Sequence, residues 1–257
     1  MKTGRKHMKL VWLAAWGAGA LAPAAGAQTL AQQLLAGYDA VQSVSCEVRR
    51  DTETVGGNSA RALSRVYFQK PDRLHVENVT PVQRRIVADG ETFFSYIEGD
   101  PKGFSRPVSQ LNEEMTIQLR KIPGTAMDHL LKIGDAPETV LPAAEGFPVR
   151  RGYEKGRLFV VLSMDPENRL ARIEFFDSPE MKNRTAQYDY SAFQPAAGGA
   201  VIPCLHRGVL WSGGVETRET VRISNLAVNQ PVPGSLFVAG PFFEGVDFVD
   251  DFGNIYE

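Results

Sequence analysis

Three histidines are the residues of this chain best suited to proton transfer, and each could activate a nucleophile. His75, His129 and His206 would need a neighbouring group such as Ser163 or Cys204 to form a hydrolase site. The Gly-x-Ser-x-Gly motif, which places a nucleophilic serine on a tight turn, does not occur. The histidines also fall in three different predicted elements. We therefore expect isolated histidines, on the surface or on a covering segment, and no catalytic site.

Four carboxylates near the C-terminus could offer oxygen ligands to a calcium ion: Glu244, Asp247, Asp250 and Asp251. An EF-hand loop alternates its ligands around a central glycine, and these residues do not follow that spacing. We interpret them as a solvated acidic tail. The sequence predicts neither a metal nor a cofactor.

The two cysteines, Cys46 and Cys204, allow two interpretations. Two thiols cannot complete a tetrahedral zinc site by themselves, and their separation excludes the Cys-x-x-Cys redox motif. In an exported protein they could form a structural disulfide. The alternative is two separate buried thiols, and the sequence leaves both open.

Residues 1–27 have the organisation of a secretory signal peptide. Basic residues precede an uncharged apolar run over residues 10–21, and Ala25-Gly26-Ala27 offers a cleavage site. The apolar run is shorter than the roughly 20 residues needed to span a bilayer. We expect cleavage after Ala27 and export to the periplasm, as a monomer.

The charge balance weighs against nucleic acid as a partner. The chain has 28 basic and 30 acidic residues, and four of the basic ones lie in the predicted signal peptide. The mature chain would then have 24 against 30, a net charge of −6. An acidic protein is poorly suited to bind polyanions.

A helix and then a long series of strands are predicted after the cleavage site. Thr29 is a candidate N-cap for a helix of about four turns with this apolar stripe: Leu30, Leu34, Tyr38 and Val41. From Ser43 the pattern has a period of two, with turn signals such as Asp89-Gly90. Connections this short join antiparallel neighbours, which predicts a meander.

The middle of the chain interrupts the strands with short amphipathic helices over residues 109–134. Pro123-Gly124 divides two apolar stripes: Leu111, Met115 and Leu119, then Met127, Leu130 and Leu131. Helices this short are unstable alone and need an apolar surface to lie on. They could be a movable lid over a cavity or a permanent part of the core.

Several strands are apolar on both faces, because neighbouring residues such as Phe93 and Phe94 point to opposite sides. Antiparallel sheets commonly keep one face in water, so both faces here need a cover. The sequence predicts one α+β domain over residues 28–257, mainly antiparallel β. A long, curled antiparallel sheet with the N-terminal helix and the short helices on its concave side would provide both covers.

Two stretches resemble the LolA superfamily, the periplasmic outer-membrane lipoprotein carriers and related lipid- or lipoprotein-binding proteins. Lys70-Pro71 takes the place of a basic residue before proline at a strand end, and residues 86–92, IVADGET, match an I-V-x-D-G-x-T motif. Residues 236–251, LFVAGPFFEGVDFVDD, are similar to the family's C-terminal stretch. The order of the elements agrees over nearly the whole mature chain.

The resemblance implies a fold class: a single curled, unclosed β-barrel, a half-barrel with an N-terminal helix and short lid helices over an apolar concave face. It also implies a non-enzymatic carrier, a chaperone that holds acyl chains of lipoproteins or free lipid in its concave cavity. Such a carrier takes cargo from an inner-membrane donor to an outer-membrane acceptor. Cavity-lining residues would come from two strands and the helices: Leu74, Val76, Phe94, Tyr96, Leu111, Met115, Leu119, Met127, Leu130 and Leu131. Lys70 would tether the lid through backbone carbonyls.

This chain departs from the carrier pattern at two positions. The family's basic residue is an arginine, and Lys70 cannot reproduce its bidentate fork. A cavity aromatic is replaced by Leu74. A second hypothesis is therefore a periplasmic protein-binding or sensing module of the same fold, without lipid transfer, whose concave side would be filled by side chains.

Overall fold

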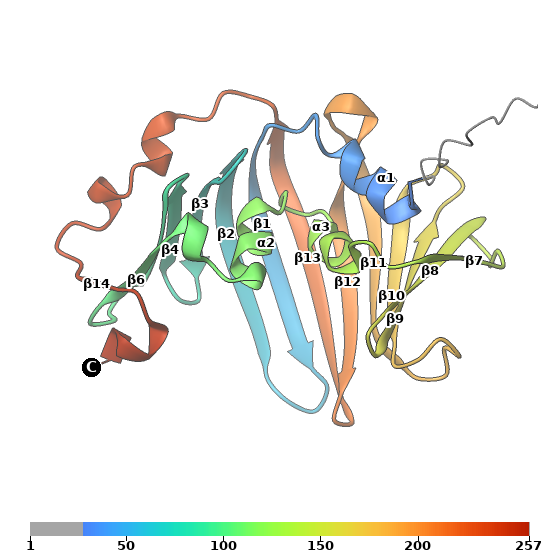
Figure 1. Cartoon of the computed structure of the whole chain (residues 1–257). Coiled ribbons are helices and arrows are strands. Elements are labelled where there is room, and N and C mark those ends of the chain that lie inside the picture. Colours follow the sequence, from blue (N-terminus) through green and yellow to red (C-terminus); the bar gives the residue numbers. More distant parts are fainter. Residues whose placement is uncertain (1–27, 257) are drawn as a thin grey trace, which may run out of the picture.

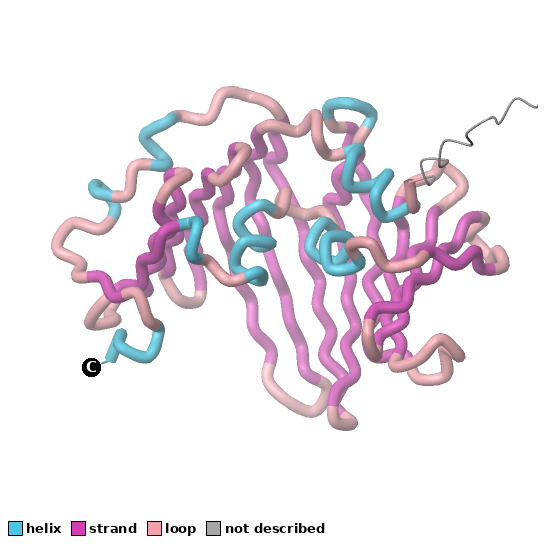
Figure 2. The backbone as a smooth tube through the Cα atoms, viewed as in Figure 1, coloured by secondary structure: helices cyan, strands magenta, loops and turns pink. Residues whose placement is uncertain are grey.

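The computed structural model describes residues 28–256, so the predicted signal peptide lies outside the described residues. Fourteen strands form one curled sheet that does not close, in the order β14-β6-β5-β4-β3-β2-β1-β13-β12-β11-β10-β9-β8-β7 (Figures 1 and 2). Three α-helices of the described residues lie against it. This confirms the unclosed half-barrel with helices. Within the described residues, every helix is too short or too polar to cross a membrane.

Two meanders build the sheet. The first contains six strands: β1 (Ser43–Thr54), β2 (Ser59–Gln69), β3 (Arg73–Thr80), β4 (Arg84–Asp89), β5 (Thr92–Ile97) and β6 (Gly103–Pro107). The second contains seven: β7 (Glu138–Leu141), β8 (Val149–Lys155), β9 (Leu158–Met164), β10 (Leu170–Phe176), β11 (Arg184–Pro195), β12 (Val201–Ser212) and β13 (Val215–Val228). Antiparallel pairing of β13 with β1 joins them, so the chain returns to its first strand.

The predicted hairpin at Asp89-Gly90 is confirmed between β4 and β5. Gly90 has a φ of 105°, which a side chain would disfavour. Asp89 Oδ1 accepts hydrogen bonds from the backbone N–H groups of Glu91 and Thr92, both at 2.8 Å. The turn fixes the register, in which Ala88 pairs with Phe93.

Helix α1 (Leu30–Gly37) begins where the sequence predicts, but it is shorter. Thr29 forms a capping box with Gln32. The helix ends at Gly37 with Tyr38 as its C-cap, so it has about two turns where four were expected. Tyr38 and Val41 are buried all the same, because the chain passes through the core before entering β1.

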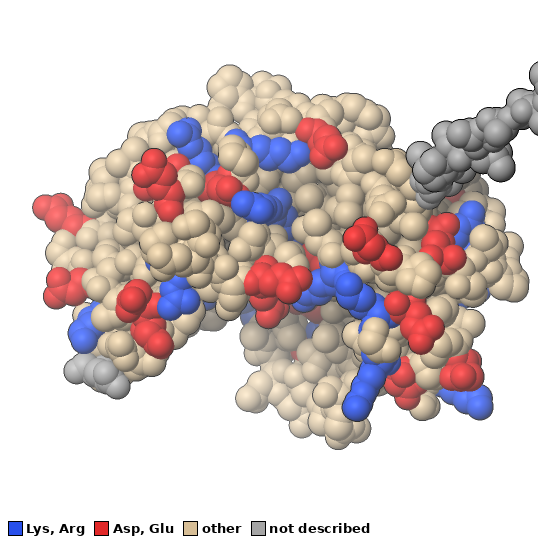
Figure 3. Space-filling view, viewed as in Figure 1, with Lys and Arg blue, Asp and Glu red and all other residues tan. Residues whose placement is uncertain are grey.

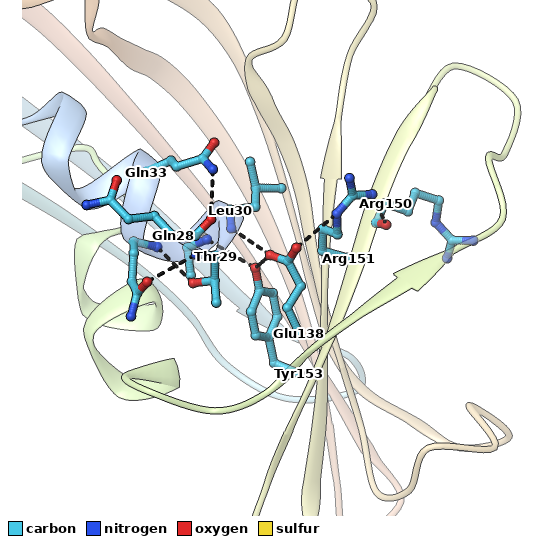
Figure 4. Close-up of polar contacts among 10 residues, drawn as sticks. Gln28, Thr29, Leu30, Gln33, Glu138, Arg150, Arg151 and Tyr153 are labelled. Atoms are coloured by element: carbon cyan, nitrogen blue, oxygen red, sulfur yellow. Dashed lines mark hydrogen bonds and ion pairs between the residues drawn. The ribbon is translucent and has the colours of Figure 1, made fainter. Parts of the chain in front are cut away.

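The N-terminus of α1 is fixed by Glu138 on β7 (Figure 4). Its Oε2 accepts hydrogen bonds from the Leu30 N–H at 2.6 Å and from the Tyr153 hydroxyl, while Arg151 Nε donates to Oε1 at 3.1 Å. A carboxylate is favoured here because the first N–H groups of a helix carry partial positive charge. Burial and the neighbouring Glu138 carboxylate raise the pKa of Tyr153. Helix α1 is thereby anchored to the edge of the second meander.

Helices α2 (Glu113–Arg120) and α3 (Met127–Ile133) lie on the concave face, preceded by the 3-10 turn η1 (Val108–Gln110) (Figure 1). The predicted break at Pro123-Gly124 is confirmed. Gly124 has a φ of 81°, and a Cβ there would lie 2.0 Å from Ile223 Cδ1 of β13. This close approach fixes the link between the two helices to the central strands.

The C-terminal strap, residues 230–256, runs over the convex face of the first meander and then turns around its edge to the concave side, where Phe252 stacks on Phe104 and lines a groove beneath α2. It contains η3 (Gly234–Phe237), η4 (Gly240–Phe242), β14 (Phe248–Val249) and η5 (Phe252–Tyr256). His75 Nδ1 lies 2.8 Å from the Leu236 carbonyl oxygen, and the His75 ring packs on Phe242. Strand β14 then pairs in parallel with β6 at the edge of the sheet (Figure 1, red). The strands of this half are apolar on both faces, and the strap provides the cover that their convex face requires.

Candidate functional site

The concave face carries a groove beneath α2, on the half built by the first meander. One part has a volume of about 480 Å³ over β1–β4, and a second part of about 320 Å³ lies between α2 and β3–β5. Leu74, Arg84, Ile86 and Gln118 line both parts, which therefore adjoin. Volumes of this size are typical of small-molecule sites, roughly 300–1,000 Å³. Figure 3 shows the molecule hollowed below the helices.

Strand register sorts the concave face of the first meander into three rows across neighbouring strands, and part of each row lines the groove. The first row is apolar: Val44, Phe68, Leu74, Ala88 and Phe93. Only Leu74 and Phe93 of this row line the groove, because the other three are completely buried. The second is apolar except for its last member: Cys46, Val66, Val76, Ile86 and Ser95. The third is mainly polar: Val48, Ser64, Asn78 and Arg84. The floor therefore changes from apolar to polar across the width of the groove.

Helix α2 forms the roof. Asn112 caps its N-terminus by accepting a hydrogen bond from the Met115 N–H at 2.9 Å. Leu119 is buried against the floor, whereas Met115 is half-buried and lines the smaller part of the groove. Leu111 is also half-buried and packs on the same cluster. Methionine adapts its shape easily, which suits a roof over flexible chains.

Asp72 holds α2 to the rim of the sheet, where the resemblance implied Lys70. Arg120 Nε lies 2.6 Å from Asp72 Oδ1, and Arg120 Nη2 lies 3.2 Å from Oδ2, which makes a forked ion pair. Lys70 Nζ instead donates to the carbonyl oxygens of Tyr38 at 2.9 Å and Asp39 at 3.2 Å. These carbonyls follow α1, and the end of a helix attracts a cation. Lys70 therefore secures α1, and the expected lid tether is wrong in this respect.

Phe94 and Tyr96 do not face the groove, contrary to expectation. Phe93 points inward, so its neighbour Phe94 points outward and packs on Phe243 and Phe248 of the strap. Tyr96 lies on the same outer face. The register across the Asp89-Gly90 turn determines which of the two phenylalanine rings faces the groove. Ala88 pairs with both Leu74 and Phe93, and residues paired across neighbouring strands point to the same face of the sheet.

Helix α3 packs on the concave face over the second meander and leaves a smaller hollow of about 210 Å³ beside α1. Leu130 is completely buried, in a cluster with Leu162 and Ile173. Leu131 is 38% exposed and points away, so the expectation that it lines a cavity is wrong. Consecutive residues of a helix point in directions about 100° apart, and only one of this pair can face the sheet. Met127 is half-buried and packs beside the other cluster, next to α2.

His129 of α3 is partly buried between aromatic rings. Its ring centroid lies 5.2 Å from that of Phe175 and 4.7 Å from that of Tyr188. Burial lowers the pKa of His129 to about 4. The imidazole is therefore neutral at pH 7 and serves as a packing group. The position of His129 on a covering segment agrees with the prediction from the sequence, whereas His75 is buried on β3 and does not lie on the surface or on a covering segment.

Most charged groups inside the concave face are paired with one another. Arg50 Nε lies 3.2 Å from Glu219 Oε2, and His206 Nε2 lies 3.5 Å from Glu219 Oε1. Lys121 Nζ lies 2.9 Å from Asp128 Oδ2 and links the end of α2 to α3. These contacts neutralise charge beside the groove and leave its apolar rows free of ions.

Cys46 and Cys204 are both free thiols in the structure, buried in the cluster below α2. They lie on β1 and β12, on either side of β13. Burial, followed by the neighbouring Cys204 and Glu47, raises the pKa of Cys46 to about 12. Within residues 28–256, no three His, Cys, Asp or Glu side chains gather closely enough to hold a metal ion.

A separate hollow of about 590 Å³ lies on the convex side, between the strap and β3–β5. Its walls include Glu77, Tyr96 and Phe243, and Arg85 lies over the Phe242 ring at 4.8 Å from its centroid. Arg85 Nη2 also donates to Glu77 Oε1 at 2.7 Å. The convex hollow is thus polar and internally paired, and it lacks the apolar rows of the groove.

Three solved structures resemble this chain. A LolA superfamily protein from Nitrosomonas europaea matches with a TM-score of 0.51 and 15% identity, over 82% of this chain and 98% of that one. A DUF1329 family protein from Desulfovibrio piger matches with a TM-score of 0.54 and 12% identity, over 81% and 94%. A candidate outer membrane lipoprotein-sorting protein domain from Vibrio parahaemolyticus matches with a TM-score of 0.51 and 11% identity, over 80% and 94%. At these identities the likeness concerns the fold.

Comparison with family models and with curated proteins gives no match. The structural likeness therefore stands without a matching sequence family.

Proposed function

We propose that this chain, which has the fold of the LolA superfamily, is a non-enzymatic periplasmic carrier of apolar cargo. Its cargo would be acyl chains of lipoproteins or other lipids, received from an inner-membrane donor and passed to an outer-membrane acceptor. The observation that carries the proposal is the groove beneath α2, whose first two rows are apolar. Apolar surface left unfilled beneath a helix is costly unless a ligand covers it.

In this proposal α2 is the moving part of the lid, and α3 stays in place. Helix α2 is short, roofs a groove that it does not fill, and is tethered by a pair in which Arg120 is half-exposed. The link that follows it is buried at Ile122 and Thr125 and held close to β13 by Gly124. Displacement of α2 about this link would open the groove while leaving the core of the second meander intact.

The second candidate function, a binding or sensing module without lipid transfer, is favoured by the half of the concave face that α3 covers. There Leu130 and Ile133 of α3 occupy the space against Tyr153 and Ile173. A protein partner would then dock on the concave side of the sheet, without lipid transfer.

Mass spectrometry of lipids extracted from the purified mature protein tests the proposal directly, together with uptake of the neutral probe 1-N-phenylnaphthylamine. Val76→Glu places a charge among the apolar rows at a half-buried position, and we expect it to abolish probe uptake. Val140→Glu is the matched control, because Val140 is 71% exposed on β7 and lies outside the groove. Absence of bound lipid and equal probe uptake by both variants would favour the binding module.

A further inference from the structure

Arg84 stands at the boundary between the apolar and polar rows of the groove. It is the first residue of β4, and its side chain lines both parts of the groove. The guanidinium donates from Nε at 3.1 Å and from Nη2 at 3.0 Å to a single oxygen, the Oγ of Ser95. Ser95 is itself buried on β5, so this contact draws Arg84 into the groove.

Arg84 has no carboxylate partner among the described residues. No acidic oxygen of residues 28–256 lies within ion-pair distance of it, whereas Arg50 is paired with Glu219 and Lys121 with Asp128. Burial lowers the pKa of Arg84, because a charged guanidinium is less stable away from water than in it. An arginine nonetheless stays protonated in proteins. A partly buried cation without a counter-charge is costly, and an anionic ligand would relieve that cost.

Arg84 is the unpaired cation among the described charged residues that line the larger part of the groove. No aspartate or glutamate lines this part, and its other two cations, Arg50 and Lys121, are paired with Glu219 and Asp128. In the smaller part Arg84 faces one acidic residue, Glu114 on α2. Such a lining contrasts with the acidic balance of the chain from Gln28 onward. Attraction between a guanidinium and a carboxylate or phosphate is strong because two N–H groups can donate in parallel.

We propose that the groove binds an amphiphile with an anionic head, a carboxylate or a phosphate, which pairs with Arg84 while its acyl chain lies along the apolar rows. Ile86 and Leu74 continue the floor from Arg84 toward Phe93, and Met115 covers it from α2. Asn78 and Ser64 lie beside the head position and hydrogen-bond to each other at 2.7 Å. This inference rests on the proposed function and adds the chemical class of the cargo.

The test compares three ligands with the same C18:1 chain length, each below its micelle threshold: oleate, oleoyl lysophosphatidic acid and oleyl alcohol. Binding is measured by displacement of 1-N-phenylnaphthylamine. We expect Arg84→Gln to weaken the preferred anion by about tenfold to a hundredfold, the range of a charge-assisted hydrogen bond, and to leave oleyl alcohol unchanged. Which anion loses more identifies the head as carboxylate or phosphate. Arg84→Lys should retain part of the affinity, because the charge remains without the fork.

Arg85→Gln is the matched control, since Arg85 is the next residue of the same strand and lies on the convex face. It should leave all three affinities unchanged, and thermal unfolding checks that each variant folds. Equal binding of the anions and the alcohol by the parent protein, or equal losses in the two glutamine variants, overturns the anionic head. If 1-N-phenylnaphthylamine itself fails to bind the parent protein, the carrier proposal fails first, so the two failures are distinguishable.

Discussion

Helix α3 lies on strands of the second meander and packs closely against them, whereas α2 lies on the first meander and leaves a larger groove. The two helices are similar in length, with eight residues in α2 and seven in α3. They differ in what they direct at the sheet. Each helix inserts two buried residues, Leu130 and Ile133 from α3 and Ile117 and Leu119 from α2. Helix α2 in addition places the half-buried Met115 and the exposed Gln118 over its strands, where they line the groove. Two helices of similar length can thus have different structural roles, one as part of the core and the other as the roof of a groove.

The two halves also differ in how they are attached. The second meander secures α1 through Glu138, which accepts from the Leu30 N–H and the Tyr153 hydroxyl. The ion pair that attaches the roof of the first meander to its sheet joins Asp72 and Arg120 at the exposed rim. Elements that move in binding come from the less stable parts of a fold. The comparison therefore predicts that stability resides in the α3 half and mobility in the α2 half.

The largest expected effect comes from truncating Leu130. Leu130→Ala should lower the free energy of unfolding by about 2–5 kcal/mol, because the side chain is completely buried and a cavity would remain. Leu131→Ala is the control on the same helix, and at 38% exposure it should cost at most about 0.5 kcal/mol. Urea denaturation measures both. Equal losses would show that α3 does not pack as described and would remove the contrast between the halves.

The second effect is a pH dependence located at His129. Its pKa is about 4 in the folded protein, against 6.5 for an unperturbed histidine side chain. Between these values the unfolded chain binds a proton that the folded protein does not, so stability is complete above about pH 6.5 and is lost as the pH falls toward 4. At about 1.4 kcal/mol for each unit of difference in pKa, the free energy of unfolding falls by about 3 kcal/mol over this range of pH.

His129→Phe should remove this contribution while keeping an aromatic ring between Phe175 and Tyr188. The measurement is the difference in unfolding free energy between the parent protein and the variant at pH 7 and at pH 4. Other groups, such as His75, titrate in both proteins and cancel in the difference. A difference that does not change with pH would mean that His129 is not buried in the folded state.

The sequence was informative about the fold for a physical reason. Period-two alternation and turn residues such as Asp89-Gly90 act locally, and they correctly predicted antiparallel meanders interrupted by short helices. The break at Pro123-Gly124 and the cap at Thr29 are local as well. A curled sheet covered by helices followed because strands with two apolar faces need covers on both sides, whereas the unclosed half-barrel was implied by the family resemblance.

The candidate site was less predictable because it depends on distant contacts. Phe93 and Phe94 are chemically identical, and what distinguishes them is the strap, whose Phe243 and Phe248 cover only one of them. The sequence also did not indicate which residue tethers α2. Lys70 and Asp72 lie in the same turn, but Lys70 contacts the end of α1 and Asp72 contacts α2. No sequence pattern indicated that Arg84 lacks a carboxylate partner in the described chain.

A smaller effect is expected when the tether is removed. Asp72→Asn should cost less than about 1 kcal/mol of stability, because Arg120 is half-exposed and such pairs contribute little. Amide exchange in α2 should nonetheless become faster, while exchange in α3 stays unchanged. Lys70→Met is the control and should affect only the end of α1. Faster exchange of α2 in the Lys70 variant, and not in the Asp72 variant, would restore the tether that the family resemblance implied.

The smallest effect on stability is expected from adding a reductant. Its targets would be Cys46 and Cys204, which flank β13 at the boundary of the two meanders. Because both are free thiols, a reductant should leave the melting temperature unchanged. Thiol titration of the unfolded, unreduced protein should give two thiols for each chain. In the folded protein, burial raises the pKa of both thiols, so the thiolate needed for alkylation is scarce and the reaction should be slow. A count of zero thiols after unfolding would show that the meanders are joined by a disulfide, and the two halves could then not open independently at this boundary.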